Sequence, residues 1–354
     1  MTDKNKTKQE FIHTVAVDDG SGNIAYAYYD EAGELHEDYR PSIIEKGAGA
    51  GANGLSPNIW ECESGNRYTV RTASSEPENT CNREYQTSEV NRVLIANTLA
   101  DAGLGGKRIN IGCTIPTEHF YNKNDPMNPI DYELIERKKA SILSPVTSPF
   151  GDKDSPIYES VKVYPEAIPG YLYASHDENG MKEEYQSDQK TLVVDLGRFT
   201  DDLAIIGPGF EVLDYSTRSH GVHKMIDHFH GLLQRHASEL NLSSVKSMSF
   251  TDLERIINQG YIGSASEKES AVKARKDVTG LIAESAQYLA NLIKQDIDEL
   301  TENNLDTFDR IVFIGGGAYW LGEIAQRWFH TVDIPAEPEM AIVRGVHLLL
   351  QSGN

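Results

Sequence analysis

The sequence predicts an α/β protein of two duplicated lobes, each with a sheet flanked by helices. At 354 residues the chain exceeds what one core supports, since single cores stop growing near ~250 residues. A strand–aspartate–glycine–strand pattern occurs early, with Asp18, and again in mid-chain, with Asp195. A further strand near the C-terminus leads into three consecutive glycines and a helix. Together these patterns indicate a repeated architecture with one hairpin in each lobe.

Composition and charge indicate which partners and sites the chain is expected to lack. A hydrophobic fraction of 39% and a charged fraction of 25% are typical of globular proteins. The net charge of −21 would repel a phosphate backbone, so we expect no direct DNA binding, and any role on DNA would need a basic adaptor. Cys62, Cys81 and Cys113 form no C-x-x-C pair, which argues against disulfides and a zinc site.

The start of the chain and its apolar runs bear on location. Residues 1–10 are polar and contain lysines, so we expect a flexible N-terminal tail. No stretch approaches the roughly 18 apolar residues of a membrane-spanning helix. The sequence therefore predicts a cytoplasmic protein with no membrane partner.

In the first half of the chain, alternating apolar residues predict a hairpin of strands over residues 11–17 and about 24–29. The glycine- and alanine-rich residues 47–54 predict a surface loop. Apolar spacing of three and four residues, with Ser88 as a cap, predicts a helix over 88–103. The remaining elements expected here are a strand over 108–113, a charged helix over 131–143, a loop over 144–156 and a strand over 160–164.

In the second half, the polar break at 177–189 precedes an apolar strand over 191–194. Helical spacing predicts helices over about 219–237, 267–300 and 317–330, with a strand over 310–314 between the last two. We place the boundary at the polar break, so that domain I comprises 11–188 plus 336–354 and domain II comprises 189–335.

The two hairpins have a shared chemistry. A glycine turn exposes backbone N–H groups and lets an anion approach closely, because no Cβ intervenes. A carboxylate beside each turn would repel phosphate unless a divalent cation and its waters lay between, and Mg²⁺ is the natural choice. Asp18 and Asp195 are the candidate carboxylates. Taken alone, each segment could equally be an ordinary hairpin turn, but the repetition favours a polyphosphate clamp.

The third element is the strand 311–314 followed by Gly315, Gly316, Gly317 and a helix. Such a strand delivers a flat surface without side chains at a helix start, which suits a nucleoside and its phosphate. A Rossmann turn has the same local form, but this one lies too near the C-terminus for the βαβ unit that would follow.

In this order, these motifs resemble the actin/DnaK/sugar-kinase superfamily and, within it, the ParM/StbA family of actin-like plasmid-segregation ATPases. The resemblance runs from about residue 12 to the C-terminus, and ERKKA is its most family-specific part. The matching segments are VDDGS at 17–21, CTIP at 113–116, ERKKA at 136–140, VKV and PE at 161–166 and IGGGA at 314–318. The resemblance implies an actin-like fold of RNase H-like sheets flanked by helices, with a nucleotide cleft between two lobes.

The resemblance also implies roles for matching residues. Asp18 and Asp195 would arrange Mg²⁺ through water, and Glu166, held between two prolines, would orient or deprotonate the water that attacks the γ-phosphate. A surface glutamate capping the next helix is the alternative for Glu166. The expected nucleotide-binding residues are Asp19, Gly20, Ser21, Gly22, Asn23, Gly197, Arg198, Gly221, Gly315, Gly316 and Gly317.

Two positions depart from the family pattern. Arg198 and Phe199 stand where a glycine and a threonine are usual, and Ala25 stands where a lysine is usual. We hypothesise that the Arg198 guanidinium replaces the missing ammonium and contacts phosphate. The alternative is that Arg198 points to solvent.

Two weaker patterns favour ordinary explanations. His223, Asp227 and His230 share a helical face at metal-binding spacing, but the helix is rich in histidine and chance alignment explains this. The basic run 137–139 predicts a solvated face that could meet an acidic surface of a neighbouring subunit.

The function implied is an ATPase that polymerises head to tail with ATP and Mg²⁺, with GTP left open as the nucleotide, and whose hydrolysis destabilises the filament. In the family this cycle segregates plasmid DNA through a DNA-bound adaptor of the ParR type. Two alternatives stay open: a small-molecule kinase of the same superfamily, and a nucleotide-gated binding protein without productive hydrolysis.

Overall fold

A computed structural model describes residues 11–51, 54–55, 58–74, 76–125, 127–151, 153–177, 180–182, 185 and 188–352. The chain divides into two compact units. Unit 1 comprises Met1–Tyr173 and Ile342–Asn354, and unit 2 comprises Ala174–Ala341. The tail expected over residues 1–10 lies outside the described residues.

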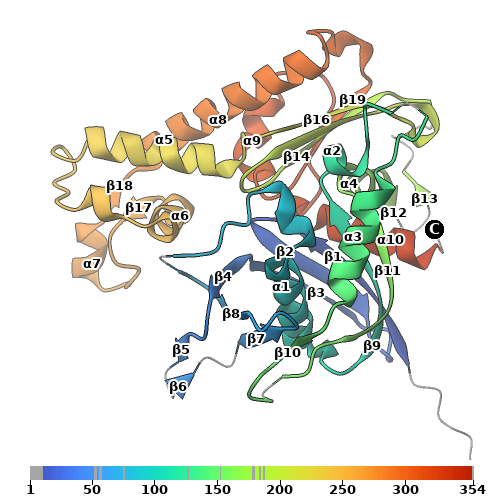
Figure 1. Ribbon diagram of the computed structural model, residues 1–354. Helices are drawn as coiled ribbons and strands as arrows, with labels where there is room; N and C mark the ends of the chain where they lie inside the picture. Colours follow the sequence, from blue (N-terminus) through green and yellow to red (C-terminus); the bar gives the residue numbers. More distant parts are fainter. Residues whose placement is uncertain are drawn as a thin grey trace, which may run out of the picture. The chain divides into compact units, whose positions relative to one another are not determined.

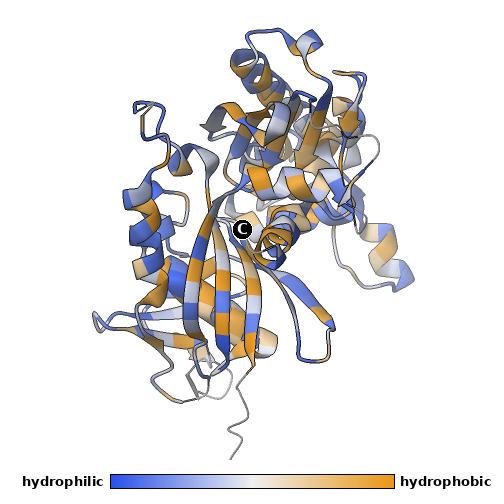
Figure 2. Ribbon diagram, turned by 90° about the vertical axis from the view of Figure 1, so that its right-hand side faces the viewer, coloured by the Kyte–Doolittle hydropathy of each residue, from blue (hydrophilic) through white to orange (hydrophobic). Residues whose placement is uncertain are grey.

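Unit 1 contains a five-stranded sheet in the order β11-β9-β1-β2-β3 (Figure 1). Strands β1, β2 and β3 form an antiparallel meander, and β9 and β11 run parallel to β1. Apolar residues on both faces of β1 and β2 are buried, as expected for a sheet covered on both sides. Hydrophobic and hydrophilic bands along the strands are visible in Figure 2. The strand bounds are β1 (Ile12–Asp19), β2 (Asn23–Tyr29), β3 (Leu35–Pro41), β9 (Arg108–Ile115) and β11 (Ile157–Pro165).

The helices of unit 1 begin where the sequence places capping residues. The Ser88 side chain accepts a hydrogen bond from the Asn91 amide at the start of α1 (Glu89–Leu99). Asp131 caps α3 (Tyr132–Leu143) in the same way. After α1 the chain makes a π-helical turn over Ala100–Leu104, in which Gly103 has a φ of 86°. The remaining helices are α2 (Thr117–Phe120), α4 (Ala167–Ser175) and α10 (Ala341–Gln351).

A second sheet in unit 1, in the order β10-β7-β8-β4, was not predicted. Its strands are short and carry no long alternating pattern, so only their packing defines them. Ile44, Ile59 and Trp60 are fully or almost fully buried, and the Trp60 indole donates to Asn97 Oδ1 at 3.0 Å. Within and just after the loop expected at 47–54, Ala50 pairs with Leu55 and Gly51 pairs with Gly54 in a short antiparallel ladder. The bounds are β4 (Ile43–Lys46), β5 (Ala50–Gly51), β6 (Gly54–Leu55), β7 (Ile59–Cys62), β8 (Arg67–Arg71) and β10 (Val146–Thr147).

Unit 2 repeats the plan of the first five-stranded sheet. Its order is β16-β15-β14-β19-β20, with an antiparallel meander and two parallel strands. In the two central hairpins, Asp18 pairs with Ala25 and Asp195 pairs with Asp202. The duplicated architecture is therefore confirmed. The bounds are β14 (Thr191–Leu196), β15 (Asp201–Ile206), β16 (Val212–Arg218), β19 (Arg310–Ile314) and β20 (Val332–Asp333).

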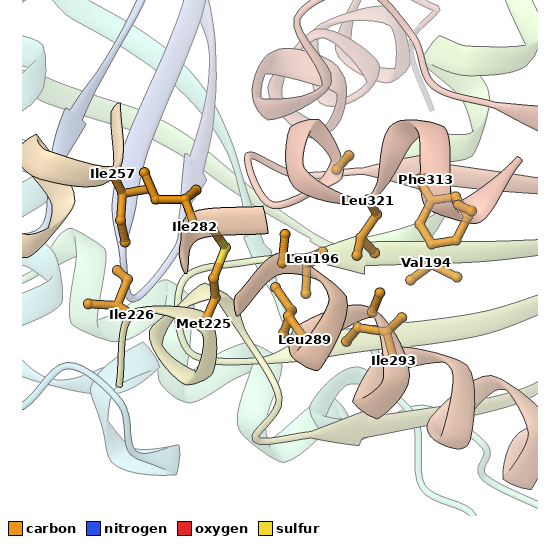
Figure 3. Packing of buried hydrophobic residues seen from close by; sticks show 14 of the residues in the cluster. Val194, Leu196, Met225, Ile226, Ile257, Ile282, Leu289, Ile293, Phe313 and Leu321 are labelled. Carbon is orange, nitrogen blue, oxygen red and sulfur yellow. The ribbon is translucent and has the colours of Figure 1, made fainter. Parts of the chain in front are cut away.

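Helices α5 (Val222–Arg235) and α8 (Thr279–Leu300) lie side by side in unit 2 (Figure 1). Their buried faces share one core with the sheet. Figure 3 shows Leu289 near Leu196, and Ile293 near Val194. The other helices of this unit are α6 (Phe250–Gln259), α7 (Glu269–Ala274) and α9 (Ala318–Ala325).

The single helix predicted over about 267–300 is wrong. The chain forms α7, then β18 (Lys276–Asp277), and only then α8. Strand β18 pairs with β17 (Tyr261–Ile262), and the Arg275 guanidinium lies 4.3 Å from the centre of the Tyr261 ring. These tertiary contacts interrupt a stretch whose spacing alone favours one long helix.

The two units divide earlier than the boundary drawn at residues 188 and 189. The segment after Ala174 packs within unit 2, where β12 (His176–Asp177) pairs with β13 (Gly180–Met181). The buried Tyr185 donates to Asp333 Oδ2 at 2.7 Å. Among the described residues, no helix is long and apolar enough to cross a bilayer.

Candidate functional site

The turn between β1 and β2 carries the first predicted phosphate loop. Its carbonyl oxygens are fixed by donors from other segments: Ser42 Oγ donates to Gly20 O at 2.8 Å, and Thr80 Oγ1 donates to Ser21 O at 2.7 Å. The Ser42 amide donates to Gly22 O at 2.9 Å. These bonds turn the carbonyl side of the loop toward the protein, which is the arrangement that an anion-binding turn needs.

Asp18, at the carboxyl end of β1, is half-buried beside β9. Its Oδ1 accepts a hydrogen bond from Thr114 Oγ1 at 3.0 Å. The hydroxyl orients the carboxylate at the edge of the sheet where the first loop begins. Carboxylate oxygens are ligands that Mg²⁺ prefers, and the role of Asp18 toward the ion stays a prediction.

The neighbouring Asp19 has a different environment from the one predicted. Its side chain is fully buried and forms an ion pair with Lys138, which is also fully buried. Asn91 Nδ2 donates to Asp19 Oδ2 at 2.7 Å, and the Thr114 amide donates to Oδ1 at 3.2 Å. Because its carboxylate is engaged in the interior, only the backbone of Asp19 remains to contribute to a nucleotide site.

Lys138 corrects the expectation of a solvated basic run at 137–139. Besides Asp19, its ammonium donates to Gln86 Oε1 at 2.6 Å and to Asn91 Oδ1 at 3.0 Å. Arg137 is exposed and Lys139 is partly exposed, so only the flanking residues form the solvated face. Sequence reasoning missed Lys138, although its place on the apolar side of α3, four residues after the buried Leu134, was a signal.

Glu166 lies at the junction of β11 and α4. Its amide donates to Ile115 O at 3.1 Å, and the next amide, of Ala167, donates to Thr117 Oγ1 at 3.1 Å. These bonds fix the backbone at Glu166 and at the residue that follows it. The side chain is buried, so the alternative of a surface glutamate is wrong.

The second predicted loop joins β14 to β15. The Gly197 amide donates to Thr200 O at 2.9 Å, which closes the turn. At the start of α5, the amides of Val222 and His223 donate to the carbonyls of Gly197 and Arg198 at 3.0 and 2.9 Å. The loop therefore satisfies the first amides of α5. A Cβ on Gly221 would lie 2.5 Å from the Phe199 amide nitrogen, so this close docking requires glycine.

Asp195 and the triple glycine meet at the carboxyl ends of β14 and β19. Gly315 has a φ of 79°, and a Cβ there would collide with Asp195 Oδ1. A Cβ on Gly317 would lie 2.7 Å from Leu196 Cδ2. Gly316 is different, because it is exposed and the nearest atom to its hypothetical Cβ, Glu339 Cβ, is 3.8 Å away. Packing thus explains two of the glycines but not the third.

Arg198 lies against α6. Its guanidinium is 3.2 Å from Glu254 Oε2 and 4.6 Å from the centre of the Phe250 ring, and only 16% of the side chain is exposed. Burial lowers the pKa of Arg198 and raises the pKa of Glu254, and in each case the attraction between the two charges opposes the shift. The alternative that Arg198 points to solvent is wrong. The contact with Glu254 involves one nitrogen of the guanidinium, Nη2.

Among the described side chains, His223, Asp227 and His230 do not form a metal-ligating cluster. His230 Nε2 lies 2.9 Å from Val245 O, and His223 Nδ1 lies 3.3 Å from Arg198 O. Burial lowers the pKa of His223. Both histidines therefore connect α5 to neighbouring loops.

Two protein-family models match the chain. The model described as "Plasmid segregation protein ParM, N-terminal" matches residues 13–177, and the "Alp7A C-terminal domain" model matches residues 190–332. A comparison with curated protein sequences gives no significant match.

Solved structures of low sequence identity share the fold. The actin-like protein Alp7A is 15% identical with a TM-score of 0.73, and the match covers 97% of both chains. A ParM from a 15-stranded filament of Clostridium botulinum is 17% identical with a TM-score of 0.68, over 96% of this chain and 99% of that one. The archaeal actin homologue Ta0583 in complex with ADP is 16% identical with a TM-score of 0.69, over 97% and 100%. The fold is therefore actin-like.

Proposed function

Because the chain is an actin-like protein that combines a ParM-type N-terminal domain with an Alp7A-type C-terminal domain, we propose that it is an ATPase that assembles into filaments. The observation that carries this proposal is the repeated hairpin. In both five-stranded sheets, an aspartate at the carboxyl end of the central strand is followed by a glycine turn. Ligands of α/β sheets bind at the carboxyl ends of the strands.

In this proposal the turns at residues 20–23 and at Gly197 bind the phosphates of ATP through backbone amides. Asp18 and Asp195 would hold Mg²⁺ through water, and the ion would neutralise phosphate charge. Glu166 orients the attacking water and accepts its proton, which its fixed backbone supports. Gly221 and the glycines at 315–317 form the floor for the nucleoside.

The filament and its use are inferred from the relatives. The Clostridium botulinum ParM is a filament subunit, and the name of the matched N-terminal family refers to plasmid segregation. We propose that this chain likewise associates head to tail when ATP is bound, and that hydrolysis weakens the subunit contact. With a net charge of −21, its link to plasmid DNA would pass through a basic, DNA-bound adaptor of the ParR type.

Light scattering and phosphate release, measured together on the pure protein, test this function. On addition of ATP and Mg²⁺ we expect scattering to rise, phosphate to appear, and scattering then to fall as ATP is consumed. Phosphorylation of a small molecule without polymer would instead support the kinase alternative. Saturable nucleotide binding with neither polymer nor phosphate would support a nucleotide-gated binding protein.

Gly316 gives a sharper test of where the nucleotide binds. The change Gly316→Val adds a side chain whose Cβ would meet Glu339 Cβ at an ordinary contact distance of 3.8 Å, so folding should be unaffected. ATP affinity, in contrast, should fall by at least about tenfold, or ~1.4 kcal/mol. The measurement is calorimetric titration with ATP and Mg²⁺. Gly280→Ala, in α8, is the control, since a Cβ there meets nothing within 4 Å and the residue lies outside the proposed site. Equal affinity in Gly316→Val and wild type would contradict a floor at 315–317.

Arg198 can be tested separately. If its guanidinium contacts phosphate, Arg198→Ala should weaken ATP binding, whereas Glu254→Ala should not, because the latter only removes the resting partner. Titration of both variants with ATP measures the difference. Unchanged affinity in Arg198→Ala assigns the residue to the packing of the second loop on α6.

A further inference from the structure

Unit 2 contains a buried group of metal-ligating side chains, none of which is among the residues proposed to bind nucleotide. Asp201 begins β15, His220 precedes α5, and Asp296 lies in α8. One ligand atom from each of the three lies within 4.8 Å of the other two. Asp201 is fully buried, Asp296 is 4% exposed, and the His220 side chain is 29% exposed. The two carboxylates are therefore shielded from solvent, and solvent can reach the cluster along the His220 side chain.

The hydrogen bonds of the cluster leave one carboxylate oxygen without a partner. The His220 amide donates to Asp201 Oδ1 at 3.3 Å, and His220 Nδ1 contacts Asp296 Oδ2. Asp201 Oδ2 is buried and has no hydrogen-bond donor among the described residues. A buried carboxylate oxygen without a partner is costly, so its presence calls for a missing positive group.

The charged neighbours do not supply that group. Arg218, which pairs with Asp201 across β15 and β16, directs its guanidinium to Glu299 at 3.2 Å. Asp202, next to Asp201, adds a further negative charge and accepts hydrogen bonds from Thr200 and Thr217. The cluster therefore contains two carboxylates and an imidazole, and a cation between them would give Asp201 Oδ2 the positive partner that it lacks.

We propose that Asp201, His220 and Asp296 bind a divalent transition-metal ion, with Zn²⁺ as the best match. Carboxylate oxygens and an imidazole nitrogen are ordinary zinc ligands, and three protein ligands leave a position for water on the open side, beside His220. The ion would neutralise both buried carboxylates. It would also link the start of β15 and His220 to α8.

A second cluster of the same composition carries no such proposal. Ligand atoms of Asp30, Glu34 and His36 also lie within 4.8 Å of one another. However, the Asp30 oxygens already accept bonds from the amides of Ala32 and Glu34 and contact His36 Nε2. These contacts describe a turn closed by an aspartate. This surface cluster serves as the control for adventitious binding.

A bound proton is the competing explanation for the buried cluster. Burial, followed by the charges of Asp296 and Asp202, raises the pKa of Asp201 to about 8. A protonated Asp201 could donate to Asp296 and leave no need for a metal. The two explanations differ in their response to Zn²⁺ and Co²⁺, which only the metal site binds tightly.

The test is a titration of the full-length, chelator-treated protein with Zn²⁺, and with Co²⁺ as a spectroscopic probe. The variant Asp201→Asn keeps the side-chain shape and can donate to Asp296, so it should fold as the wild type does, as checked by circular dichroism without metal. We expect it to lose at least about tenfold in Zn²⁺ affinity and to lose the visible absorption of Co²⁺. The control, Asp30→Asn with His36→Gln, should retain both.

Binding of Zn²⁺ should also raise the thermal midpoint of the wild type but not of Asp201→Asn, since a ligand specific to the folded state stabilises it. The proposal is overturned if wild type and Asp201→Asn bind Zn²⁺ equally, or if binding disappears in the surface-cluster control. It is also overturned if neither metal binds to the wild type. None of these readouts depends on ATP, so the failure of this proposal and of the proposed function are distinguishable.

Discussion

At the scale of single residues, equivalent positions in the two units carry different side chains for a clear physical reason. Asp19 follows Asp18 at the end of β1, and Leu196 follows Asp195 at the end of β14. Both side chains are fully buried. The leucine is satisfied by the core of unit 2, whereas the aspartate needs the buried ammonium of Lys138.

Loss of the Lys138 ammonium should therefore destabilise the fold strongly. Lys138→Met leaves the Asp19 carboxylate buried without its counter-charge, and we expect the free energy of unfolding to fall by about 3–5 kcal/mol. Urea denaturation followed by circular dichroism measures the change. The adjacent Lys139→Met should alter stability by less than about 0.5 kcal/mol, because the ion pair that Lys139 makes with Glu136 lies at the surface.

The double variant Asp19→Leu with Lys138→Met separates charge from packing. It copies the leucine of unit 2 and removes both charges, so most of the lost stability should return. If the double variant is as unstable as Lys138→Met, the ammonium acts through its bonds to Gln86 and Asn91 rather than through Asp19.

At the scale of elements, the start of α5 and the loop after β14 are held together by backbone hydrogen bonds. The loop carbonyls accept the first amides of the helix, and Gly221 lets the two backbones approach closely. A helix of 14 residues is thereby fixed to the turn that carries Gly197. The geometry of the loop after β14 thus depends on a glycine 24 positions along the chain from Gly197.

The change Gly221→Ala should separate the loop from the helix. Its Cβ would lie 2.5 Å from backbone atoms of Phe199, and we expect a loss of about 1–3 kcal/mol in the free energy of unfolding. Gly231→Ala, within the same helix, meets only Arg235 Nη1 at 3.6 Å and should gain about 0.5–1 kcal/mol. Thermal unfolding of the two variants measures both effects, and a loss of the same size at position 231 would refute the loop-specific explanation.

At the scale of the whole molecule, net charge opposes assembly. Each chain carries −21, so two copies repel each other through solution wherever salt does not screen them. The Debye length shrinks from about 30 Å at 0.01 M salt to about 8 Å at 0.15 M. Screening should therefore favour any association between copies of this chain.

We accordingly expect the critical concentration for ATP-dependent polymerisation to fall as KCl is raised from about 0.01 M to about 0.15 M. Sedimentation of polymer at a series of protein concentrations measures it, with Mg²⁺ and ATP held constant. A critical concentration that rises with salt would mean that attractive ion pairs at the subunit contact outweigh the overall repulsion.

The local features of the fold and site could be predicted from the sequence. Both hairpins, the cap Ser88 and the strand before the triple glycine follow from patterns only a few residues long. The second sheet of unit 1 could not, because its strands are two to five residues long and are defined by partners far along the chain.

The sequence by itself determined that this protein has two duplicated α/β lobes with an aspartate and a glycine turn at the head of each, because backbone conformation there depends on neighbouring residues. Only the tertiary structure decided what each charge meets. Lys138 reaches Asp19 across 119 positions, Arg198 pairs with Glu254, and Asp201 gathers with His220 and Asp296. The partner of a buried charge is chosen by packing in three dimensions, and no local pattern records it.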